Sequence, residues 1–216
     1  MLTDRSLEEL RRDGFTKIAG VNAREFVAIA NHLGKPIRTR RGGSFVDTLR
    51  PKESSEAREG TISAQYGLSA FPWHSDGAVD PHPPRYVLLR AVEVNPASAR
   101  TEVLDLARLD DGNFLQRYRR LTCMVNSGRG HYMASFLSRQ SGVMCAKWDP
   151  LRMQALGKMA CAFEQDIGEA LPHDSHAWGR DDLLIVDNWR CLHRRTPANV
   201  SDLRVLQRVV VKTSRG

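Results

Sequence analysis

The sequence lacks the features that mark membrane-spanning, secreted and disordered proteins. Its longest apolar runs, such as residues 86–89 and 209–211, are far too short to cross a bilayer. The opening residues, MLTDRSLEEL, mix acidic and basic side chains and contain no apolar segment of a secretory signal. Hydrophobic residues form 41% of the chain and charged residues 26%, which is the composition of a folded globular protein. We therefore expect a folded, cytoplasmic protein without a membrane span.

Cysteine is also scarce, and its spacing excludes a CxxC metal or redox motif. The four cysteines lie far apart, at Cys123, Cys145, Cys161 and Cys191. In a reducing compartment, cysteines at such spacing remain free thiols, and most of them belong to the core. We expect no disulfide framework.

Basic residues, in contrast, are in excess. The formal net charge is +7, from 32 Lys and Arg against 25 Asp and Glu. Such a charge attracts anions, whether nucleic acid, an acidic carrier or small carboxylates. Two clusters, at residues 38–41 and 117–120, are basic, but no zinc-finger, RNP or glycine-rich phosphate motif accompanies them. A solvated basic face is therefore favoured over a nucleic-acid surface.

The chain shows no internal repeat, low-complexity tract or linker, so we expect residues 1–216 to form a single domain. We expect a helix at residues 6–13 that is capped by Ser6, and a second helix at residues 23–33 that is capped by Asn22. A third helix is expected to begin at Pro150 and to continue over residues 151–171. Residues 38–60 are expected to form a long loop, and such loops in compact domains are often functional. Strands are predicted at residues 15–18, 61–65, 86–94, 102–106, 121–126, 183–186 and 205–212. Many short strands with a few helices predict a mainly β fold with peripheral helices, a β-sandwich or jelly-roll barrel.

One irregular stretch, FPWHSDGAVDPHPP at residues 71–84, carries His74 and Asp76 two positions apart. On a strand these side chains point the same way, although a lone H-x-D is a weak signal. A third candidate ligand, His193, follows an apolar strand and Asp187-Asn188. Two histidines and one carboxylate can form a facial triad that suits Fe(II).

The next strand carries Arg204 and Arg208, whose spacing of four places both on one side. A guanidinium near the metal can bind a carboxylate through two parallel hydrogen bonds. A zinc or other hydrolytic site also fits the three ligands but leaves the arginine pair unexplained. A cupin-like sensor that binds a small ligand would keep the histidines and is a further alternative.

Taken together, these segments resemble the taurine dioxygenase (TauD/TfdA-like) family of Fe(II)- and 2-oxoglutarate-dependent oxygenases. The resemblance covers about residues 20–212. Thr101 lies 27 positions after His74, and Arg204 and Arg208 lie 11 and 15 positions after His193, as in the family. The other matching segments are Trp73-His74-Ser75-Asp76, Pro83-Pro84 before the strand at 86–94, Leu33-Gly34-Lys35-Pro36-Ile37, and the D-N-x-x-x-x-H-x-R pattern at 187–195.

The resemblance implies a double-stranded β-helix with a jelly-roll, cupin-like core. It implies that His74, Asp76 and His193 are the metal ligands and catalytic centre, and that Thr101 and Arg204 bind 2-oxoglutarate. Arg208 either meets an anionic group of the substrate or helps to place the co-substrate. The implied reaction hydroxylates a C–H bond with Fe(II), 2-oxoglutarate and O2, and releases succinate and CO2.

The chain departs from the family pattern at three places. Arg194 replaces the usual glycine after the distal histidine, Ser98-Ala99-Arg100 replaces a Gly-Gly-Asp run, and the chain is short between residues 105 and 181. The metal ligands are intact, so these changes bear on the substrate. We expect a small polar or anionic substrate that resembles an amino acid, a sulfonate or a carboxylate. An oxygenase that acts on nucleic acid or on a carrier-bound substrate is the alternative, and the sequence leaves a homo-oligomer open.

Four further histidines have simpler explanations. His173 and His176 are expected in an exposed loop rather than at a metal site. His82 lies between prolines and is expected either at the surface or in the layer of residues that surrounds the metal ligands. His131 is expected outside the pocket. Cys191, two residues before a candidate ligand, is expected to pack in the core.

Overall fold

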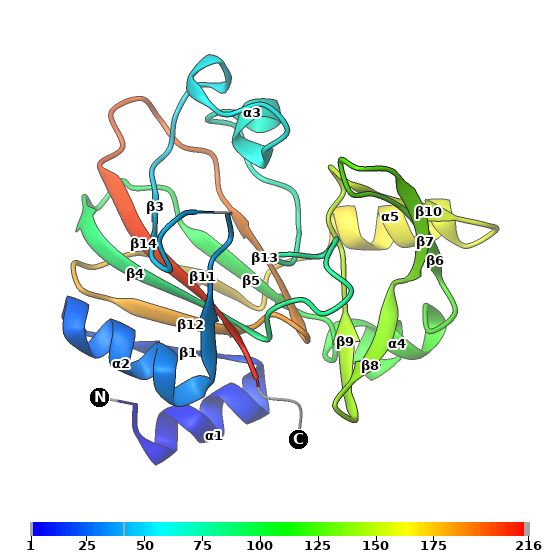
Figure 1. Ribbon diagram of the computed structural model, residues 1–216, viewed down its shortest axis with the longest axis horizontal. Coiled ribbons are helices and arrows are strands. Elements are labelled where there is room, and N and C mark those ends of the chain that lie inside the picture. Colours follow the sequence, from blue (N-terminus) through cyan, green and yellow to red (C-terminus); the bar gives the residue numbers. More distant parts are fainter. Residues whose placement is uncertain (1, 41, 214–216) are drawn as a thin grey trace.

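Two antiparallel β-sheets pack against each other in the computed structural model, which describes residues 2–40 and 42–213 (Figure 1). In spatial order the larger sheet contains β1 (Phe15–Ile18), β12 (Leu183–Asp187), β4 (Tyr86–Val94), β14 (Arg204–Lys212) and β2 (Lys35–Ile37), and β3 (Asp47–Leu49) also pairs with β14. The smaller sheet contains β11 (Asp174–His176), β5 (Thr101–Asp105) and β13 (Cys191–Arg195). This arrangement confirms the predicted mainly β, jelly-roll architecture with peripheral helices.

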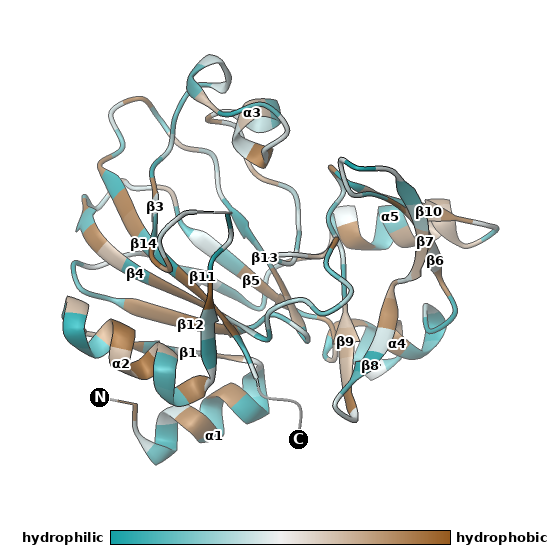
Figure 2. Cartoon of the chain, in the orientation of Figure 1, coloured by the Kyte–Doolittle hydropathy of each residue, from teal (hydrophilic) through white to brown (hydrophobic). Residues whose placement is uncertain are grey.

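Strand alternation divides the larger sheet between two apolar layers. Val87 and Leu89 on β4 face the smaller sheet, whereas Leu88 between them faces the helices. The helix layer consists of α1 (Asp4–Asp13) and α2 (Ala23–Leu33), whose apolar sides turn toward the sheet in Figure 2. Phe26 and Ile29 of α2 are buried there. The inner layer is the one that continues toward the polar residues of the site.

A smaller lobe lies beside the two sheets (Figure 1). It contains a sheet in the order β10 (Met153–Leu156), β6 (Thr122–Asn126) and β7 (His131–Ser135), a hairpin of β8 (Leu137–Gln140) and β9 (Val143–Ala146), and the helices α4 (Phe114–Arg117) and α5 (Ala160–Glu169). Its centre is aromatic: Phe163 packs against Phe136 and Trp148 with ring centroids 4.8 and 4.9 Å apart. The same cluster includes Leu104 and Leu192 of the smaller sheet, so the lobe covers the outer face of that sheet.

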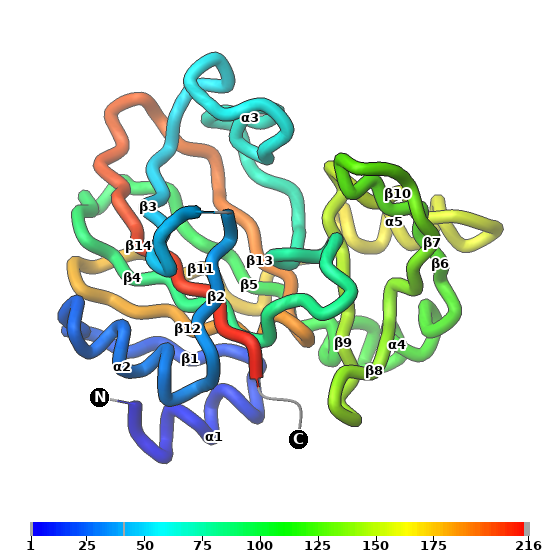
Figure 3. Tube along the Cα trace, viewed as in Figure 1, coloured from blue at the N-terminus to red at the C-terminus, as the bar shows by residue number. Residues whose placement is uncertain are grey.

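The segment expected to be a long loop, residues 38–60, is partly regular. It contains β3 and a 3-10 turn, η1 (Ser54–Glu56), and leads to α3 (Ile62–Tyr66), while a second 3-10 turn, η2 (Leu109–Gly112), precedes α4. Figure 3 follows this segment from β3 to α3, above the sheets. Arg41 of the basic cluster at 38–41 lies outside the described residues.

Several local predictions are confirmed and three are wrong. Asn22 does cap α2, with its side chain accepting from the amides of Arg24 and Glu25. In α1, however, Thr3 rather than Ser6 is the cap, and the Thr3 hydroxyl accepts from the Ser6 amide at 3.2 Å. The helix therefore begins one turn earlier than the sequence pattern indicated.

The predicted strand at 61–65 is instead the helix α3. Thr61 accepts a hydrogen bond from the amide of Ala64, and Gly67 follows the last helical residue. Thr61 and Ile62 are β-branched, which suggested a strand. The N-cap and the glycine decide the local structure here.

The predicted helix at 151–171 is correct only in its second part. Residues 153–156 form β10, which pairs with β6, and Gly157 turns the chain with a φ of +86° before α5 begins at Ala160. The helix-favouring composition of this segment is overridden by strand pairing. Pro150 precedes a strand rather than starting a helix.

The remaining predictions concern cysteines and membrane spans. All four cysteines are free thiols, and Cys123, Cys145 and Cys191 are buried whereas Cys161 is exposed. None of the helices in the described part of the chain is long and apolar enough to cross a membrane.

Candidate metal centre

Two histidines that are 119 positions apart in the sequence meet through a backbone bridge. The amide of His74 donates to the carbonyl of His193 at 3.1 Å, and the amide of His193 donates back at 2.9 Å. Residues in such a hydrogen-bonded antiparallel pair lie directly opposite each other, with their side chains on the same face. The two imidazole rings consequently lie side by side, with centroids 4.5 Å apart.

The third candidate ligand, Asp76, is fixed by its main chain. The side chain of Asn188 accepts from the Asp76 amide at 2.8 Å and donates to the Asp76 carbonyl at 3.0 Å. The same amide group donates to the carbonyl of Pro84 at 2.9 Å. Asn188 is fully buried. This explains why an asparagine follows Asp187 before the distal histidine: it ties the segment of the first ligand to the strand end that leads to His193.

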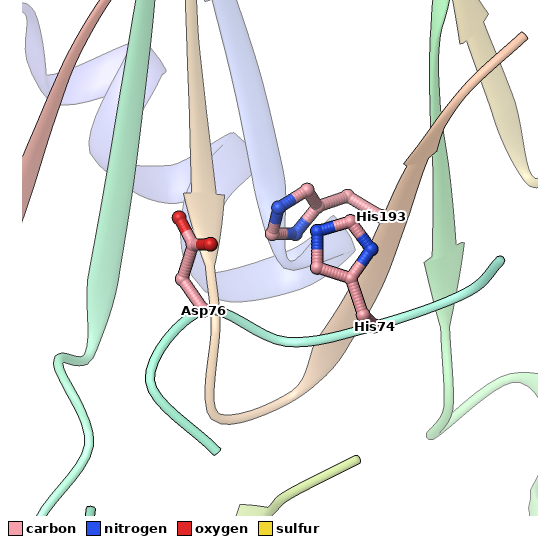
Figure 4. Close-up of side chains that lie close together, drawn as sticks. All are labelled: His74, Asp76 and His193. Carbon is pink, nitrogen blue, oxygen red and sulfur yellow. The ribbon is translucent and has the colours of Figure 1, made fainter. Parts of the chain in front are cut away.

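The ligand-capable atoms of His74, Asp76 and His193 all lie within 4.8 Å of one another. Figure 4 shows the carboxylate of Asp76 turned toward the two imidazoles. Within the described residues this is the one group of three or more such side chains that could hold a metal ion. Nδ1 of His74 lies 2.9 Å from the carbonyl of Pro72, which fixes the ring and leaves Nε2 for a metal.

The electrostatics of the group suit a divalent cation. Burial, together with the neighbouring His74, lowers the pKa of His193 to about 3, so its imidazole is neutral near pH 7. Burial alone would raise the pKa of Asp76, but Arg208 and the two histidines outweigh it and the net pKa is lowered. Neutral imidazoles and an ionised carboxylate are the protonation states that metal binding requires. The donor set fits the facial triad predicted from the sequence.

Arg204 lines the same cavity as the triad, and this buried cation has no carboxylate partner in the part of the chain that the structure describes. Its Nη2 donates to the Thr101 hydroxyl oxygen at 2.9 Å, and its Nε has no hydrogen-bond partner among the described residues. Burial, and then repulsion from Arg195, lower the pKa of Arg204 to about 9. An uncompensated buried cation is costly, by several kcal/mol in order of magnitude. The site is therefore suited to an anion that enters from solvent.

Thr101 has a hydrogen to offer the same anion. Its hydroxyl oxygen accepts from Arg204 and also from Nε1 of Trp178 at 3.2 Å. With both lone pairs occupied by donors, the hydroxyl hydrogen is available to a further acceptor. Thr101 and Arg204 thus present two donors to one point, as the resemblance implied.

Arg208 has the opposite environment, since it pairs with two carboxylates of the chain. Its Nη1 lies 3.2 Å from both oxygens of Asp76, and its Nη2 donates to Asp47 at 2.9 Å. Asp47 lies directly opposite Arg208 in the pairing of β3 with β14, and it also accepts from the Thr39 hydroxyl at 2.7 Å. Burial alone would lower the pKa of Arg208, but Asp76 and Asp47 raise it.

These residues line one cavity of about 800 Å³. At its inner end lie His74, Asp76, His193, Thr101, Arg204 and Arg208. Its outer part is lined by most of the residues at 48–52 and 56–63 and by Arg152 of the small lobe. The structure thus brings together every site residue predicted from the sequence. It also places the segment at residues 38–60 against the site.

The other histidines have different outcomes. His176 is buried in β11 and stacks edge-on against Trp178, so the expectation of an exposed loop is wrong for it. His173 is half-buried, and its Nδ1 accepts from the amide of Asp105 at 3.2 Å. His82 and His131 are exposed, and neither lines the cavity. Cys191 is buried, as expected.

Sequence reasoning missed Asp47 and Trp178. Asp47 lies in a polar stretch whose only strand signal is Val46-Asp47-Thr48-Leu49, and its pairing with Arg208 depends on a long-range register. Trp178 stands between Ala177 and Gly179 and belongs to no recognisable motif. A buried tryptophan that donates to Thr101 becomes visible only in three dimensions.

Comparison with known proteins identifies the family. The family model described as taurine catabolism dioxygenase TauD, TfdA family matches residues 2–109, which is half of the chain. The chain belongs to the TauD/TfdA family. The matched half contains His74, Asp76 and Thr101, and the other half contains His193 and both arginines. No curated protein sequence matches the chain.

Solved structures of the same fold agree with this family. Asparagine oxygenase in complex with Fe(II), 2S,3S-3-hydroxyasparagine and succinate has a TM-score of 0.75 at 18% identity, over 97% of this chain and 78% of that chain. The non-haem iron oxygenase OrfP, in complex with Fe and alpha-ketoglutaric acid, has a TM-score of 0.73 at 18% identity, over 97% and 78%. PvcB from Pseudomonas aeruginosa has a TM-score of 0.67 at 19% identity, over 97% and 80%. At these identities the likeness shows the shared fold.

Membership of the TauD/TfdA family establishes the class of chemistry. The protein is a 2-oxoglutarate-dependent non-haem iron oxygenase, and its cofactors are Fe(II) and the co-substrate 2-oxoglutarate, with O2 as oxidant. The hydrolase and the non-enzymatic sensor left open by the sequence are therefore set aside.

Proposed function

We propose that residues 1–216 act as one oxygenase domain in which His74, Asp76 and His193 hold Fe(II), and that the enzyme hydroxylates an unactivated C–H bond of a polar, anionic substrate. The observation that carries this proposal is the convergence of the three ligand atoms within 4.8 Å, next to a buried arginine without a carboxylate partner. When bound, Fe(II) supplies the activation of O2. One oxygen atom goes to the substrate and the other to 2-oxoglutarate, which leaves as succinate and CO2.

In this proposal the residues of the chain bind and orient the co-substrate. Arg204 pairs with the distal carboxylate of 2-oxoglutarate, and the Thr101 hydroxyl donates to the same group. Nε1 of Trp178 donates to the hydroxyl oxygen of Thr101 at 3.2 Å, so the hydroxyl hydrogen of Thr101 points away from the tryptophan. A charge-assisted pair of this kind is strong because both groups are desolvated.

Arg208 has a third role in this proposal, distinct from the two that the sequence left open. Because Asp76 and Asp47 already neutralise its charge, we assign it to positioning the Asp76 carboxylate against the metal. A sulfonate or carboxylate of the substrate would have to compete with two intrachain carboxylates for this guanidinium. An anionic group of the substrate is therefore expected elsewhere in the cavity.

The substrate class is supported by charge and by the relatives. The charged residues that line the cavity are mainly cations, nine against three acidic side chains, which favours an anion. Asparagine oxygenase and OrfP were solved in complex with 3-hydroxyasparagine and (3S)-hydroxy-L-Arg, so those two enzymes bind hydroxylated amino acids. An amino-acid-like group at the reacting end of the substrate is consistent with both observations.

The test is an anaerobic titration with Fe(II) and 2-oxoglutarate, followed by the visible spectrum. A charge-transfer band that requires both additions and is lost in His193→Ala supports the proposal. A matched control is His131→Ala, which removes an exposed histidine outside the cavity and should leave the band unchanged. Correctly folded protein without the band would refute it. Succinate release with candidate substrates then measures turnover.

A further inference from the structure

The cavity carries positive charge that the proposed iron and 2-oxoglutarate chemistry does not use. Nine cationic and three acidic side chains of described residues line it. Arg194 and Arg208 pair with carboxylates of the chain. Arg204 is assigned to 2-oxoglutarate, and the buried Arg195 donates to the carbonyls of Gly67 and Ser69. The other five are Arg40, Arg50, Lys52, Arg58 and Arg152. They face only two further acidic side chains in the lining, Glu56 and Glu59.

Among the described residues, none of these five cations forms a salt bridge with a carboxylate. Of the two acidic side chains, Glu56 accepts from the amide of Glu53 at its own 3-10 turn. Arg152 is half-buried, and its Nη2 donates to the carbonyl of Gly60 at 2.5 Å. A carbonyl satisfies a hydrogen bond without neutralising the charge, and the carboxyl group of Asp149 acts on Arg152 only through its electrostatic field.

Four of the cations approach the cavity from two separate parts of the fold. Arg50, Lys52 and Arg58 belong to the segment between β3 and α3, whereas Arg152 precedes β10 in the small lobe. The bond from Arg152 to Gly60 joins these two parts at the rim. We call these four residues the cationic rim. The rim and the metal triad line the same cavity: His74 and His193 are buried, Asp76 is half-buried, and the rim residues of the β3–α3 segment are exposed.

The cavity is larger than 2-oxoglutarate and a free amino acid require. A water molecule takes about 30 Å³, so 800 Å³ corresponds to roughly 25 water-sized groups, whereas 2-oxoglutarate has about ten non-hydrogen atoms. Pockets of this size hold ligands of drug-like dimensions. The space that remains fits a substrate that extends from the metal to the rim.

We propose that the cationic rim binds a phosphate group at the end of the substrate that is remote from the oxidised carbon. This inference rests on the proposed function, because it assigns the substrate of the same site. One guanidinium is enough for a carboxylate, whereas a phosphate monoester carries nearly two negative charges and three acceptor oxygens. Several unpaired cations from two sides suit such a group. A nucleotide and a phosphopantetheine derivative both offer it.

The test compares phosphate esters with the same molecules lacking phosphate. Uridine 5′-monophosphate against uridine, and 4′-phosphopantetheine against pantetheine, are titrated calorimetrically into the Fe(II)/2-oxoglutarate complex without O2. The phosphate form of at least one pair should bind about tenfold tighter or more. The pair that shows the difference identifies the source of the phosphate.

Substitutions in the cationic rim test whether these residues cause the preference for the phosphate form. Lys52→Gln/Arg58→Gln should remove most of the preference for the phosphate form, as should Arg152→Gln, which acts from the other side of the rim. The control Arg24→Gln/Lys35→Gln removes the same charge from exposed residues outside the cavity and should keep the preference. All variants should retain the charge-transfer band, since none touches the metal ligands.

Two results would overturn the inference while leaving the proposed function intact. One is equal affinity for both members of each pair, within about threefold, in protein that forms the charge-transfer band. The other is an equal loss of affinity in the control variant, which would mean that only overall charge attracts the phosphate. Loss of the band in wild-type protein, in contrast, would refute the proposed function itself.

Discussion

Arg204 and Arg208 lie on the same strand and line the same cavity, but their surroundings differ. Arg208 pairs with the carboxylates of Asp76 and Asp47. Among the described residues, Arg204 has only the neutral hydroxyl of Thr101 and no carboxylate, although the Nε atoms of both arginines lack a hydrogen-bond partner. Burial lowers the pKa of Arg204, whereas the two carboxylates raise that of Arg208.

This difference distinguishes the roles of two residues that the sequence presents as a pair. A buried cation with counterions inside the chain stabilises the arrangement of those counterions. A buried cation without one is a site for an anion that arrives with a ligand. We therefore assign Arg204 to 2-oxoglutarate and Arg208 to Asp76, and the following predictions test that division.

The largest expected effect is on co-substrate binding in Arg204→Gln. The loss of a buried charge pair should weaken the binding of 2-oxoglutarate by roughly 100- to 1000-fold, or about 3–4 kcal/mol. The measurement is an anaerobic titration of the Fe(II) enzyme followed by the charge-transfer band. Fe(II) affinity without 2-oxoglutarate serves as the control and should change by less than about threefold. A variant that keeps wild-type affinity for 2-oxoglutarate would exclude Arg204 from the site.

Asn188→Ala should have the next largest effect, on stability. The variant leaves the amide and carbonyl of Asp76 and the carbonyl of Pro84 without the partner that they have in the wild type. We expect the free energy of unfolding to fall by about 2–3 kcal/mol, measured by urea denaturation. Asn199→Ala, at an exposed position, is the matched control and should lie within about 0.5 kcal/mol of wild type.

Arg208→Gln should act on the metal. Without the guanidinium the Asp76 carboxylate loses its orienting partner, so Fe(II) affinity should fall by about 10- to 100-fold. With iron saturating, the dissociation constant of 2-oxoglutarate should change by less than about threefold. Asp47→Asn should also lower the affinity for Fe(II), but by a smaller factor. The effects of the two substitutions should not be additive, because both disrupt the same network of ion pairs. Additive effects would separate Asp47 from the role of Arg208.

The smallest effect is a pH dependence specific to Arg204. Its pKa of about 9 means that the guanidinium is charged below pH 9 and becomes neutral above it. The affinity for 2-oxoglutarate should therefore be constant from pH 7 to 8 and fall by about tenfold by pH 10. The control ligand is 2-oxobutyrate, which has the same metal-chelating end but no distal carboxylate. A parallel decline of both ligands would place the titrating group at the metal end.

The predictability of the fold from sequence differs between its parts. Strand β4 and strand β12 were predicted almost to the residue, because long β-branched runs are unambiguous. The helix expected over residues 151–171 is wrong in its first part, because β10 owes its structure to pairing with β6. Local composition cannot report a partner that lies 30 positions away.

The site, like the fold, has parts that the sequence predicts and parts that depend on long-range pairing. The three ligands were predicted from their residue types and positions, and Thr101 from the family resemblance, and the structure brings them together. The sequence could not separate Arg204 from Arg208, since what distinguishes them is Asp47 on β3. That residue meets Arg208 only through the register of β3 on β14. Motif spacing predicts which residues gather, and the structure is needed to show which of them are already paired.

The most direct test of this account is to measure the anaerobic dissociation constants of both Fe(II) and 2-oxoglutarate in Arg204→Gln and Arg208→Gln. The account predicts a crossed result: Arg204→Gln loses 2-oxoglutarate affinity with Fe(II) affinity preserved, and Arg208→Gln loses Fe(II) affinity with 2-oxoglutarate affinity preserved at saturating iron. If Arg208→Gln instead weakens 2-oxoglutarate as much as Arg204→Gln does, with Fe(II) unaffected, the division between the two arginines is wrong.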